Sequence, residues 1–464
     1  MRYRPLRRVL IANRGEIAVR IARACFDEGI ECVAAVSEAD RDSLAARLAD
    51  GAICIGPAAA TASYLNVGAV VGAAIAARCD AIHPGYGFLS ERAELAQACA
   101  DHGLTFVGPP ADVIRRGGDK VEARRAARAL GIPVGEGSDA IASAAEARRI
   151  VAGIGYPVLL KAAAGGGGRG MVQVHGEAEL EEAFLRASTE AKQAFGDGTL
   201  FLERYVTNAR HVEVQVLADG QGHVIHLGER DCSCQRRYQK LVEEAPAAAV
   251  PAHLRATIGE AAVRLARALD YVGAGTMEFL VDLDREAFSF LEVNTRVQVE
   301  HPVSEMITGV DIVRAQLRIA GGAPLGLTQD DVVLRGHAIE VRINAEQPAQ
   351  GFLPSPGRIE RWVLPQGEGI RVDTHCHDGY VVGAHYDSMV AKLICWGESR
   401  AAAADRLHRA LGRVRIEGIA TTVPLLRDLV GHGDFRADRI NTCWLEDHFL
   451  PGWTARHGGV DAAA

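Results

Sequence analysis

The sequence of 464 residues contains few aromatic residues and no long apolar run. Phe, Trp and Tyr make up 5% of it, and alanine runs such as Ala401–Ala404 are common, so we expect a core of mostly small and aliphatic side chains. No stretch approaches the ~20 apolar residues of a membrane span. The N-terminus is basic, but its apolar part, Val9–Ala12, is shorter than the roughly 7–15 apolar residues of a signal peptide. These absences predict a cytoplasmic protein without membrane contact.

The sequence also lacks a disulfide framework and an excess of positive charge. Its ten cysteines are scattered, and Cys232 and Cys234 are too close together for an easy disulfide, so we expect reduced thiols. The formal net charge of −8 argues against a nucleic-acid partner, which would favour a basic surface. The length of 464 residues predicts roughly three domains.

The first 117 residues alternate between predicted strands and helices, which is typical of a parallel α/β sheet. The predicted elements are strands over Val9–Ala12, Glu31–Val36, Cys79–His83 and Leu104–Val107 and a helix over Glu16–Glu28. A second helix is predicted from the N-cap candidate Asp119 to a stop at Gly131.

Strand patterns dominate from His211 onward and predict an antiparallel α+β region. They are HVEVQVL, HVIHLGE, GTMEFLVD and FSFLEVN, followed by HAIEVRIN and MVAKLICW in a third region at about 338–450. The tail after Trp453 is rich in Gly and Ala, and we expect it to be disordered.

Four consecutive glycines, Gly165–Gly168, follow the strand-like stretch YPVLLKAAA. The run matches G-x-G-x-x-G formally, but the strand-like MVQVH follows it in place of a helix, which excludes a dinucleotide-binding fold. It is therefore either a flexible hairpin turn or a flap whose backbone N–H groups wrap phosphate oxygens, with Lys161 reaching the same phosphates. A two-residue turn needs no more than one or two glycines, so the run favours the flap.

Two glutamates in neighbouring strands carry the strongest chemical signal. A turn centred on Arg285 would place Glu278 opposite Glu292, with Cβ atoms about 4.5–5.5 Å apart. Two carboxylates that close repel each other unless a cation or a proton lies between them. A pair of solvent-facing glutamates is the alternative.

Asn294 lies two residues after Glu292 and so projects from the same face of the strand, whereas Leu291 and Val293 are expected to face the core. Two carboxylates and an amide oxygen near a phosphate flap suit Mg²⁺ that is bound jointly by protein and nucleotide.

Further charged and amide side chains point to an anionic substrate. Those on shared strand faces or in one short basic stretch are Arg296, Gln298 and Glu300; Arg236, Arg237 and Lys240; and Arg342 with Glu340 and Asn344. A solvated surface charge is the alternative for any one of the cations. His375-Cys376-His377 offers alternating histidines without a clear third ligand, so a structural or exposed loop is favoured over a zinc site.

Several long segments resemble biotin carboxylase. They are IANRGEIAVRI (11–21), AIHPGYGFLSE (81–91), HVEVQVLADGQG (211–222), ERDCSCQRR (229–237), EVNTRVQVEHPVSEMITGVDIV (292–313) and GFLPSPGRI (351–359), with Lys161 and its glycine run. The resemblance covers about residues 6–450. It implies an ATP-grasp fold of α/β and α+β class. The implied parts are a Rossmann-like N-terminal domain (1–117), an ATP-grasp domain (118–337) with a mobile lid at about 134–206, a C-terminal biotin carboxylase domain (338–450) and a tail (451–464).

The resemblance also implies roles for individual residues. The nucleotide would be held by Lys120, Lys161, Gly167, Gly168, Glu203, Arg204, Tyr205, Val206, His211, Gln235 and Tyr238, and Mg²⁺ or Mn²⁺ by Glu278, Glu292 and Asn294. Bicarbonate would be held by Lys240, Arg296, Gln298 and the Val299 backbone, with Glu300 as its base, and Arg342 would stabilise the biotin enolate. Ala164 and Tyr238 stand where the family usually has a glycine and often a histidine, so we expect altered nucleotide affinity.

The implied reaction is that of a ligase forming a C–N bond. ATP phosphorylates bicarbonate to carboxyphosphate, which breaks down to CO₂ and phosphate, and N1′ of biotin is carboxylated. No Ala/Met-Lys-Met motif is present, so we expect the biotin to arrive on a separate biotin carboxyl carrier protein. Carboxyltransferase subunits and a second copy of the chain are the other implied partners.

The final carboxyl acceptor stays open. The first half-reaction of an acetyl-CoA or acyl-CoA carboxylase is the main hypothesis. A subunit of a pyruvate or other biotin-dependent carboxylase, another ATP-grasp carboxylate ligase, and a catalytically silent nucleotide-binding subunit are the alternatives.

Overall fold

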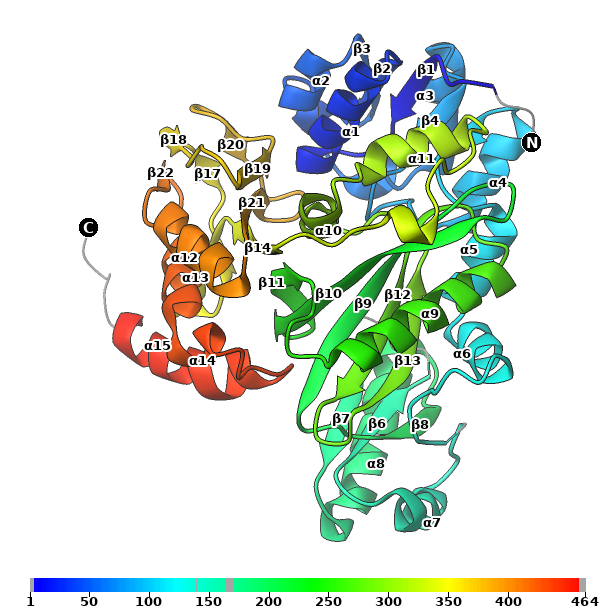
Figure 1. Ribbon diagram of the computed structural model, residues 1–464, viewed down its shortest axis with the longest axis vertical. Helices are drawn as coiled ribbons and strands as arrows, with labels where there is room; N and C mark the ends of the chain where they lie inside the picture. The colour runs from blue at the N-terminus through cyan, green and yellow to red at the C-terminus, as the bar shows by residue number, and fades with distance from the viewer. Residues whose placement is uncertain (1–3, 139, 164–169, 459–464) are drawn as a thin grey trace.

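The computed structural model describes residues 4–138, 140–163 and 170–458, and Figure 1 shows their arrangement. The N-terminal region forms a five-stranded parallel sheet in the order β3(Gly51–Gly56), β2(Glu31–Ser37), β1(Arg8–Ile11), β4(Ala81–His83), β5(Thr105–Phe106). Helices α1(Gly15–Asp27), α2(Leu44–Leu48), α3(Val67–Ala76), α4(Ala93–Asp101) and α5(Ala111–Gly118) accompany it. The predicted parallel α/β region is confirmed, although β3 had not been expected.

A single eight-stranded antiparallel sheet runs through the centre of the molecule. Its order is β13(Ala287–Asn294), β12(Gly273–Asp282), β9(Ala209–Ala218), β10(Val224–Arg236), β11(Gln239–Ala245), β14(His337–Asn344), β21(Met389–Gly397) and β19(Ile370–Thr374). Because β11 pairs with β14, the sheet continues without a break past the boundary expected at residue 337. Side chains from the central and C-terminal regions therefore meet on one continuous surface.

Helices cover this central sheet on its apolar side and close the C-terminal region. They are α9(Ala252–Ala268), α10(His301–Thr308), α11(Ile312–Ala320), α12(Arg400–Leu411), α13(Val423–Gly431), α14(Gly433–Arg436) and α15(Leu450–His457). Short strand pairs complete the region, namely β15(Glu346–Gln347) with β16(Leu353–Pro354), β17(Gly357–Arg358) with β20(Val381–Val382), and β18(Arg361–Val363) with β22(Arg415–Glu417). The core consists mostly of small and aliphatic side chains, as expected. For example, Ala403, Ala404 and Leu407 belong to one buried cluster.

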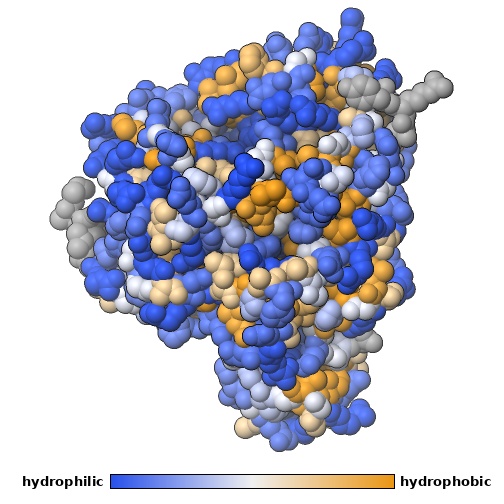
Figure 2. All heavy atoms as spheres, in the orientation of Figure 1, coloured by the Kyte–Doolittle hydropathy of each residue, from blue (hydrophilic) through white to orange (hydrophobic). Residues whose placement is uncertain are grey.

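A small lid projects from the body of the molecule. It contains the three-stranded sheet β7(Met171–Val174), β6(Val158–Ala162), β8(Leu200–Arg204) and the helices α7(Ala144–Ile154) and α8(Glu177–Phe195). Figure 1 shows it below the central sheet, and Figure 2 shows the same part as a narrower lobe on which apolar and hydrophilic side chains are interspersed. The antiparallel pairing of β6 with β7 confirms the predicted hairpin around the glycine run.

Helix α6(Lys120–Ala129) connects the N-terminal region to the lid. The Asp119 side chain accepts hydrogen bonds from the N–H groups of Val121 and Glu122, as a helix N-cap should. Gly131 beyond its C-terminus has φ of +70°, which confirms the predicted stop.

The tail prediction needs a correction. Helix α15 continues past Trp453 to His457, because the buried Trp453 indole packs in the C-terminal core and donates to Asp428. Among the described residues, no helix combines the length and the apolar character needed to cross a membrane.

Candidate active site

A cavity of about 2350 Å³ lies where the central sheet, the lid, the N-terminal region and the C-terminal region meet. Its lining includes each predicted site residue that the structure describes: Lys120, Lys161, Glu203, Arg204, Tyr205, Val206, His211, Gln235, Tyr238, Lys240, Glu278, Glu292, Asn294, Arg296, Gln298, Val299, Glu300 and Arg342. Gly167 and Gly168 lie outside the described residues, so the flap hypothesis stays a prediction.

The β12–β13 hairpin places Glu278 opposite Glu292, as predicted. The route differs from the prediction. The hairpin pairs Asp282 with Ala287, which is offset by one residue from a turn centred on Arg285, and a bulge next to Phe279 restores the register at the glutamates.

The bulge also overturns the prediction that Leu291 faces the core. Phe290 and Val293 both pack in the core, so the residues between them, Leu291 and Glu292, both turn toward the cavity. An inserted residue interrupts the two-residue alternation of a strand. Of the two predicted core positions, Val293 is therefore confirmed and Leu291 is not.

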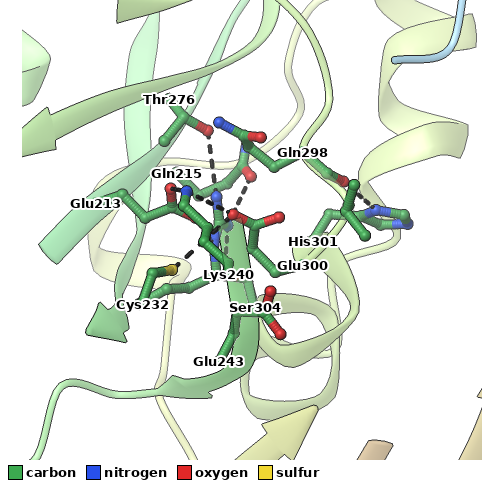
Figure 3. A network of polar contacts seen from close by, with 12 residues as sticks. Glu213, Gln215, Cys232, Lys240, Glu243, Thr276, Gln298, Glu300, His301 and Ser304 are labelled. Carbon is green, nitrogen blue, oxygen red and sulfur yellow. Dashed lines mark hydrogen bonds and ion pairs between the residues drawn. The ribbon is translucent and has the colours of Figure 1, made fainter. Parts of the chain in front are cut away.

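Lys240, on β11, lies at the centre of the polar network in Figure 3. Its ammonium donates to Glu213 (2.6 Å) and Glu300 (2.7 Å), both labelled there. It also donates to Glu278 (3.1 Å). Burial disfavours the charge, but the surrounding anionic groups raise the pKa of Lys240 well above its usual range. The lysine is therefore a fixed cation that holds three carboxylates together.

The three carboxylates around Lys240 do not titrate alike. Burial opposes ionisation of each, but Lys240 with His211 holds the pKa of Glu278 well below its usual range. Lys240 with Arg342 and Arg230 does the same for Glu300. For Glu213, burial dominates over the attraction of Arg230, and its pKa is raised. The cations therefore favour the ionised form of Glu278 and Glu300, whereas burial disfavours the ionised form of Glu213.

Arg342, on β14, bridges two carboxylates at one end of this network. Its Nε donates to Glu243 (2.6 Å) and its Nη2 to Glu300 (3.0 Å). Glu300 itself is fully buried, with one oxygen on Lys240 and the other on Arg342. The structure thus brings the expected base Glu300 into contact with two cations of the predicted site, Lys240 and Arg342.

Arg296, Gln298 and Val299 form the wall beside Glu278. The Arg296 guanidinium donates to Gln298 Oε1 (2.7 Å) and Asn294 Oδ1 (3.3 Å), and its Nε lies 3.0 Å from Glu91 of the N-terminal region. The Val299 carbonyl accepts from the buried Lys392 (2.8 Å). These residues follow β13 in a segment with a bend at Arg296 and a turn at Val299, and all three line the cavity.

Four hydrogen-bond donors surround the carboxylate of Glu278. Oε1 accepts from Lys240, Asn294 (2.8 Å) and Gln298 (3.3 Å), and Oε2 accepts from His211 (2.7 Å). Glu292 is half-buried and pairs with the exposed Lys120 (2.9 Å). The carboxylates of Glu278 and Glu292, together with the amide of Asn294, fit a hard divalent cation. The amide oxygen of Asn294 would have to turn toward that cation.

At the lid end of the cavity, Glu203 accepts from both Lys161 and Arg124. Further along, the Tyr205 hydroxyl lies 2.8 Å from the Cys443 sulfur, which ties the lid strand to the C-terminal region. Tyr238, in a turn with φ of +64°, is 53% exposed and lies at the rim. A planar ligand entering here would meet side chains from both regions.

His375-Cys376-His377 does not form a metal site among the described residues. No cluster of three possible ligands includes either histidine. His375 is buried against Tyr380, and burial, reinforced by Arg14, lowers its pKa to about 3. His377 lies at the surface 2.6 Å from Arg47, which supports the structural interpretation.

Several buried or half-buried members of the site were not predicted from the sequence. Those that contact a predicted residue are Arg124, Glu213, Glu243 and Lys392, and Arg230 pairs with Glu213 behind them. Glu213 had a usable signal, because it alternates with His211 on one strand face. The others reach the site from separate elements, so no local spacing reveals them.

The continuous antiparallel sheet, the lid at its edge and the cation-lined cavity between them define a nucleotide-using ligase of the ATP-grasp class. Family matches cover the chain in three parts: "Biotin carboxylase, N-terminal domain" at 5–114, "Carbamoyl-phosphate synthase L chain, ATP binding domain" at 119–328, and "Biotin carboxylase C-terminal domain" at 340–447. The chain is 49% identical over 448 residues to "Biotin carboxylase 1" of Bacillus subtilis, which covers 96% of this chain and 100% of that protein. The chain belongs to the biotin carboxylase family.

Solved structures agree with this assignment. A biotin carboxylase–β-γ-ATP complex from Campylobacter jejuni has a TM-score of 0.91 and 46% identity, over 96% of this chain and 99% of that one. The biotin carboxylase domain dimer of the Hydrogenobacter thermophilus 2-oxoglutarate carboxylase, in complex with MgADP, ADP and bicarbonate, has a TM-score of 0.90 and 46% identity, over 99% and 100%.

Proposed function

We propose that this enzyme carboxylates biotin in a reaction that consumes ATP and bicarbonate. The observation that carries the proposal is the fully buried Glu300, which lies between the cations Lys240 and Arg342 in a cavity that also contains the glutamate pair of the β12–β13 hairpin. A site with a base, two anion-binding cations and a place for a metal–nucleotide complex suits the activation of bicarbonate by phosphoryl transfer.

The lid end of the cavity is the proposed nucleotide site. Lys120, Lys161, Gly167 and Gly168 would hold the phosphates, and Glu203, Arg204, Tyr205, Val206, His211, Gln235 and Tyr238 would surround the remainder of the nucleotide. Glu278, Glu292 and Asn294 would hold Mg²⁺ or Mn²⁺. When bound, the metal would neutralise phosphate charge, as hard cations do in other nucleotide sites.

Bicarbonate is proposed to bind between Lys240, Arg296, Gln298 and the Val299 backbone. Its negative charge would compete with Glu300 for Lys240 and would itself repel Glu300, and both effects raise the pKa of that carboxylate. Glu300 is thus ionised in the empty site and becomes more basic once the substrate is bound. It would accept the bicarbonate proton while the bicarbonate oxygen attacks the terminal phosphorus of ATP and ADP leaves.

The later steps need a cation near the acceptor. Carboxyphosphate would break its C–O bond to give CO₂ and phosphate. The released phosphate would accept the proton from N1′ of biotin, and N1′ would attack the CO₂. The guanidinium of Arg342, which already holds Glu300 and Glu243, would stabilise the negative charge on the biotin enolate oxygen.

A transfer assay tests this function. Purified enzyme with ATP, Mg²⁺, isotope-labelled bicarbonate and free biotin should form acid-labile labelled carboxybiotin, and none should form without ATP. ATP cleavage with no label on biotin would favour another ATP-grasp carboxylate ligase.

The family assignment does not identify the partners of this chain. We propose that biotin arrives on a carrier protein and that carboxyltransferase subunits pass the carboxyl group to acetyl-CoA or another acyl-CoA. An avidin blot of this chain after co-expression with a biotin ligase should therefore be negative. A homodimer and a cytoplasmic location stay predictions, although the 2-oxoglutarate carboxylase relative is described as a domain dimer.

A further inference from the structure

Glu203 is held by two cations at the junction of the lid and helix α6. One of its oxygens accepts from Lys161 on β6, and the other accepts from Arg124 on α6. Both cations lie about equally far from the Phe201 ring, with Arg124 Cζ at 6.0 Å and Lys161 Nζ at 5.9 Å from its centroid. All four side chains line the cavity, so the cluster forms part of the proposed nucleotide site.

Helix α6 presents Arg124 from a fixed position. The helix is anchored by Ala123 and Ala127, which are both fully buried in the central core. Lys120, Arg124 and Arg128 lie at successive i, i+4 spacings and all line the cavity. Arg124 differs from the other two because it is half-buried and pairs with a buried carboxylate.

Lys161 has two competing partners. The proposed function assigns it to the nucleotide phosphates, but in this structure its ammonium is held by Glu203. Glu203 is only 7% exposed, and although burial disfavours its charge, Lys161 and Arg124 lower its pKa, so it remains ionised. If Lys161 left and nothing else paired with Glu203, a buried carboxylate would lose its only partner, which is strongly unfavourable.

We propose that Arg124 is a positioning residue that keeps Glu203 paired and thereby releases Lys161 to bind the nucleotide phosphates. The proposal rests on the proposed function, since it takes Lys161 as a phosphate ligand. Arg124 touches Glu203 rather than the phosphates, and its effect reaches the nucleotide through Lys161. Glu203 keeps a cationic partner whether Lys161 binds it or binds the phosphates. Moving Lys161 from the carboxylate to the phosphates therefore costs less free energy than it would without Arg124.

The test compares two ligands that differ only in phosphate. The dissociation constants of ADP and of adenosine are measured for the wild type and for Arg124→Met. Without the guanidinium, Glu203 holds Lys161 more tightly, so ADP affinity should fall about tenfold, as for the loss of a charged hydrogen bond. Adenosine affinity should stay unchanged, because adenosine does not need Lys161. Arg124→Lys keeps a cation and should retain most of the ADP affinity.

Arg128→Met is the matched control. Arg128 lies one helical turn further along the same cavity face, is exposed, and has no carboxylate partner among the residues that the structure describes. The substitution Arg128→Met removes the same charge from the same helix as Arg124→Met. Because solvent screens the charge of Arg128, the ADP-to-adenosine affinity ratio should change little. An equal fall in that ratio for Arg128→Met would overturn the proposal, because general electrostatics would then explain the result.

A double substitution tests the route through Glu203. Glu203→Gln removes the charge that retains Lys161, so adding it to Arg124→Met should restore the ADP-to-adenosine ratio. In a Lys161→Met background, Arg124→Met should have no further effect on that ratio. Parallel losses of ADP and adenosine affinity, or no loss of either, would overturn the proposal. If Arg124→Met unfolds in a thermal melt, Arg124→Gln carries the same expectations.

Failure of this proposal is distinguishable from failure of the proposed function. The binding ratios need neither bicarbonate nor biotin. A wild type that binds ADP through Lys161 but forms no carboxybiotin would contradict the proposed function and leave the role of Arg124 standing.

Discussion

At the scale of single residues, the site depends on how one carboxylate is kept ionised in a buried place. Glu300 has no exposed surface, and its two oxygens are held separately by Lys240 and Arg342. Such a carboxylate is a weak base until something draws its cations away. An anionic substrate does so, which couples bicarbonate binding to the basicity that the proposed chemistry requires.

Replacing Glu300 with Gln tests its role as base. The substitution keeps the shape of the side chain and removes its basicity, so bicarbonate-dependent turnover should fall by about 10²–10⁴-fold. The dissociation constant of ADP should change little, because Glu300 lies away from the lid end. Steady-state kinetics together with equilibrium binding measure both.

Glu340→Gln is the control for that substitution. Glu340 is also fully buried, on β14, and neither of its oxygens has a hydrogen-bond partner among the described residues. Burial raises its pKa well above the usual range, which favours the neutral form that Gln mimics. Turnover of Glu340→Gln should stay near that of the wild type. A drop of less than about fivefold in Glu300→Gln, with the control behaving as expected, would remove Glu300 from the base role.

At the scale of elements, the β12–β13 hairpin is the proposed metal site. Mn²⁺ binding, followed by its electron paramagnetic resonance signal in the presence of ADP, should weaken at least about tenfold in Glu292→Gln. Leu291→Ala is the matched control, since Leu291 is the neighbouring residue that the bulge also turns to the cavity and it offers no oxygen. Equal Mn²⁺ affinity in Glu292→Gln and the wild type would contradict the assignment.

Strand β11 contains two adjacent glutamates whose pKa values are shifted in opposite directions. Glu244 pairs with Arg400 and His337; burial raises its pKa, but these partners outweigh burial and bring it down to about 2. Its neighbour Glu243 faces the other way, and burial, only partly offset by Arg342, raises its pKa to about 7. Adjacent residues therefore make stability depend on pH in opposite directions.

The sign follows from comparing each pKa with ~4.3 in the unfolded chain. For Glu244 the folded pKa is lower, so its contribution is present above about pH 4.3 and is lost as the pH falls toward 2. Glu244→Gln should lower the free energy of unfolding by about 3 kcal/mol at pH 7, and the difference should shrink at acid pH. Urea unfolding at several pH values measures this.

Glu243→Gln serves as the opposite control. Its folded pKa is higher than the unfolded one, so the native protein loses stability as the pH rises from about 4.3 to about 7. Removing that group should flatten this part of the wild-type profile. Identical pH profiles for Glu243→Gln and Glu244→Gln would contradict the assigned environments.

The same elements show how far the sequence could predict the molecule. The neighbouring glutamates were predicted to lie opposite each other, but the pair forms through a turn offset by one residue and a compensating bulge, whereas the N-cap at Asp119 marked helix α6 directly. The bulge beside Phe279 could not be predicted, because an inserted residue leaves no compositional trace. The pairing of Arg124 with Glu203 spans a helix and a strand 79 positions apart, so it needed the fold.

At the scale of the whole molecule, the site exists because three regions close on one sheet. The N-terminal region supplies Glu91 to Arg296, the lid supplies Lys161 and Glu203, and the C-terminal strand β14 supplies Arg342. The β11–β14 pairing makes the last of these part of the same sheet as Lys240. The distance between the two cations around Glu300 is therefore set by strand pairing rather than by the packing of separate domains.

One measurement tests the central claim most directly, namely the dependence of ATP hydrolysis on bicarbonate and biotin. The purified chain should release phosphate from ATP only when bicarbonate and a divalent metal are present, and free biotin should accelerate the release. Hydrolysis that proceeds equally without bicarbonate, or that biotin leaves unchanged while bicarbonate is saturating, would contradict the account.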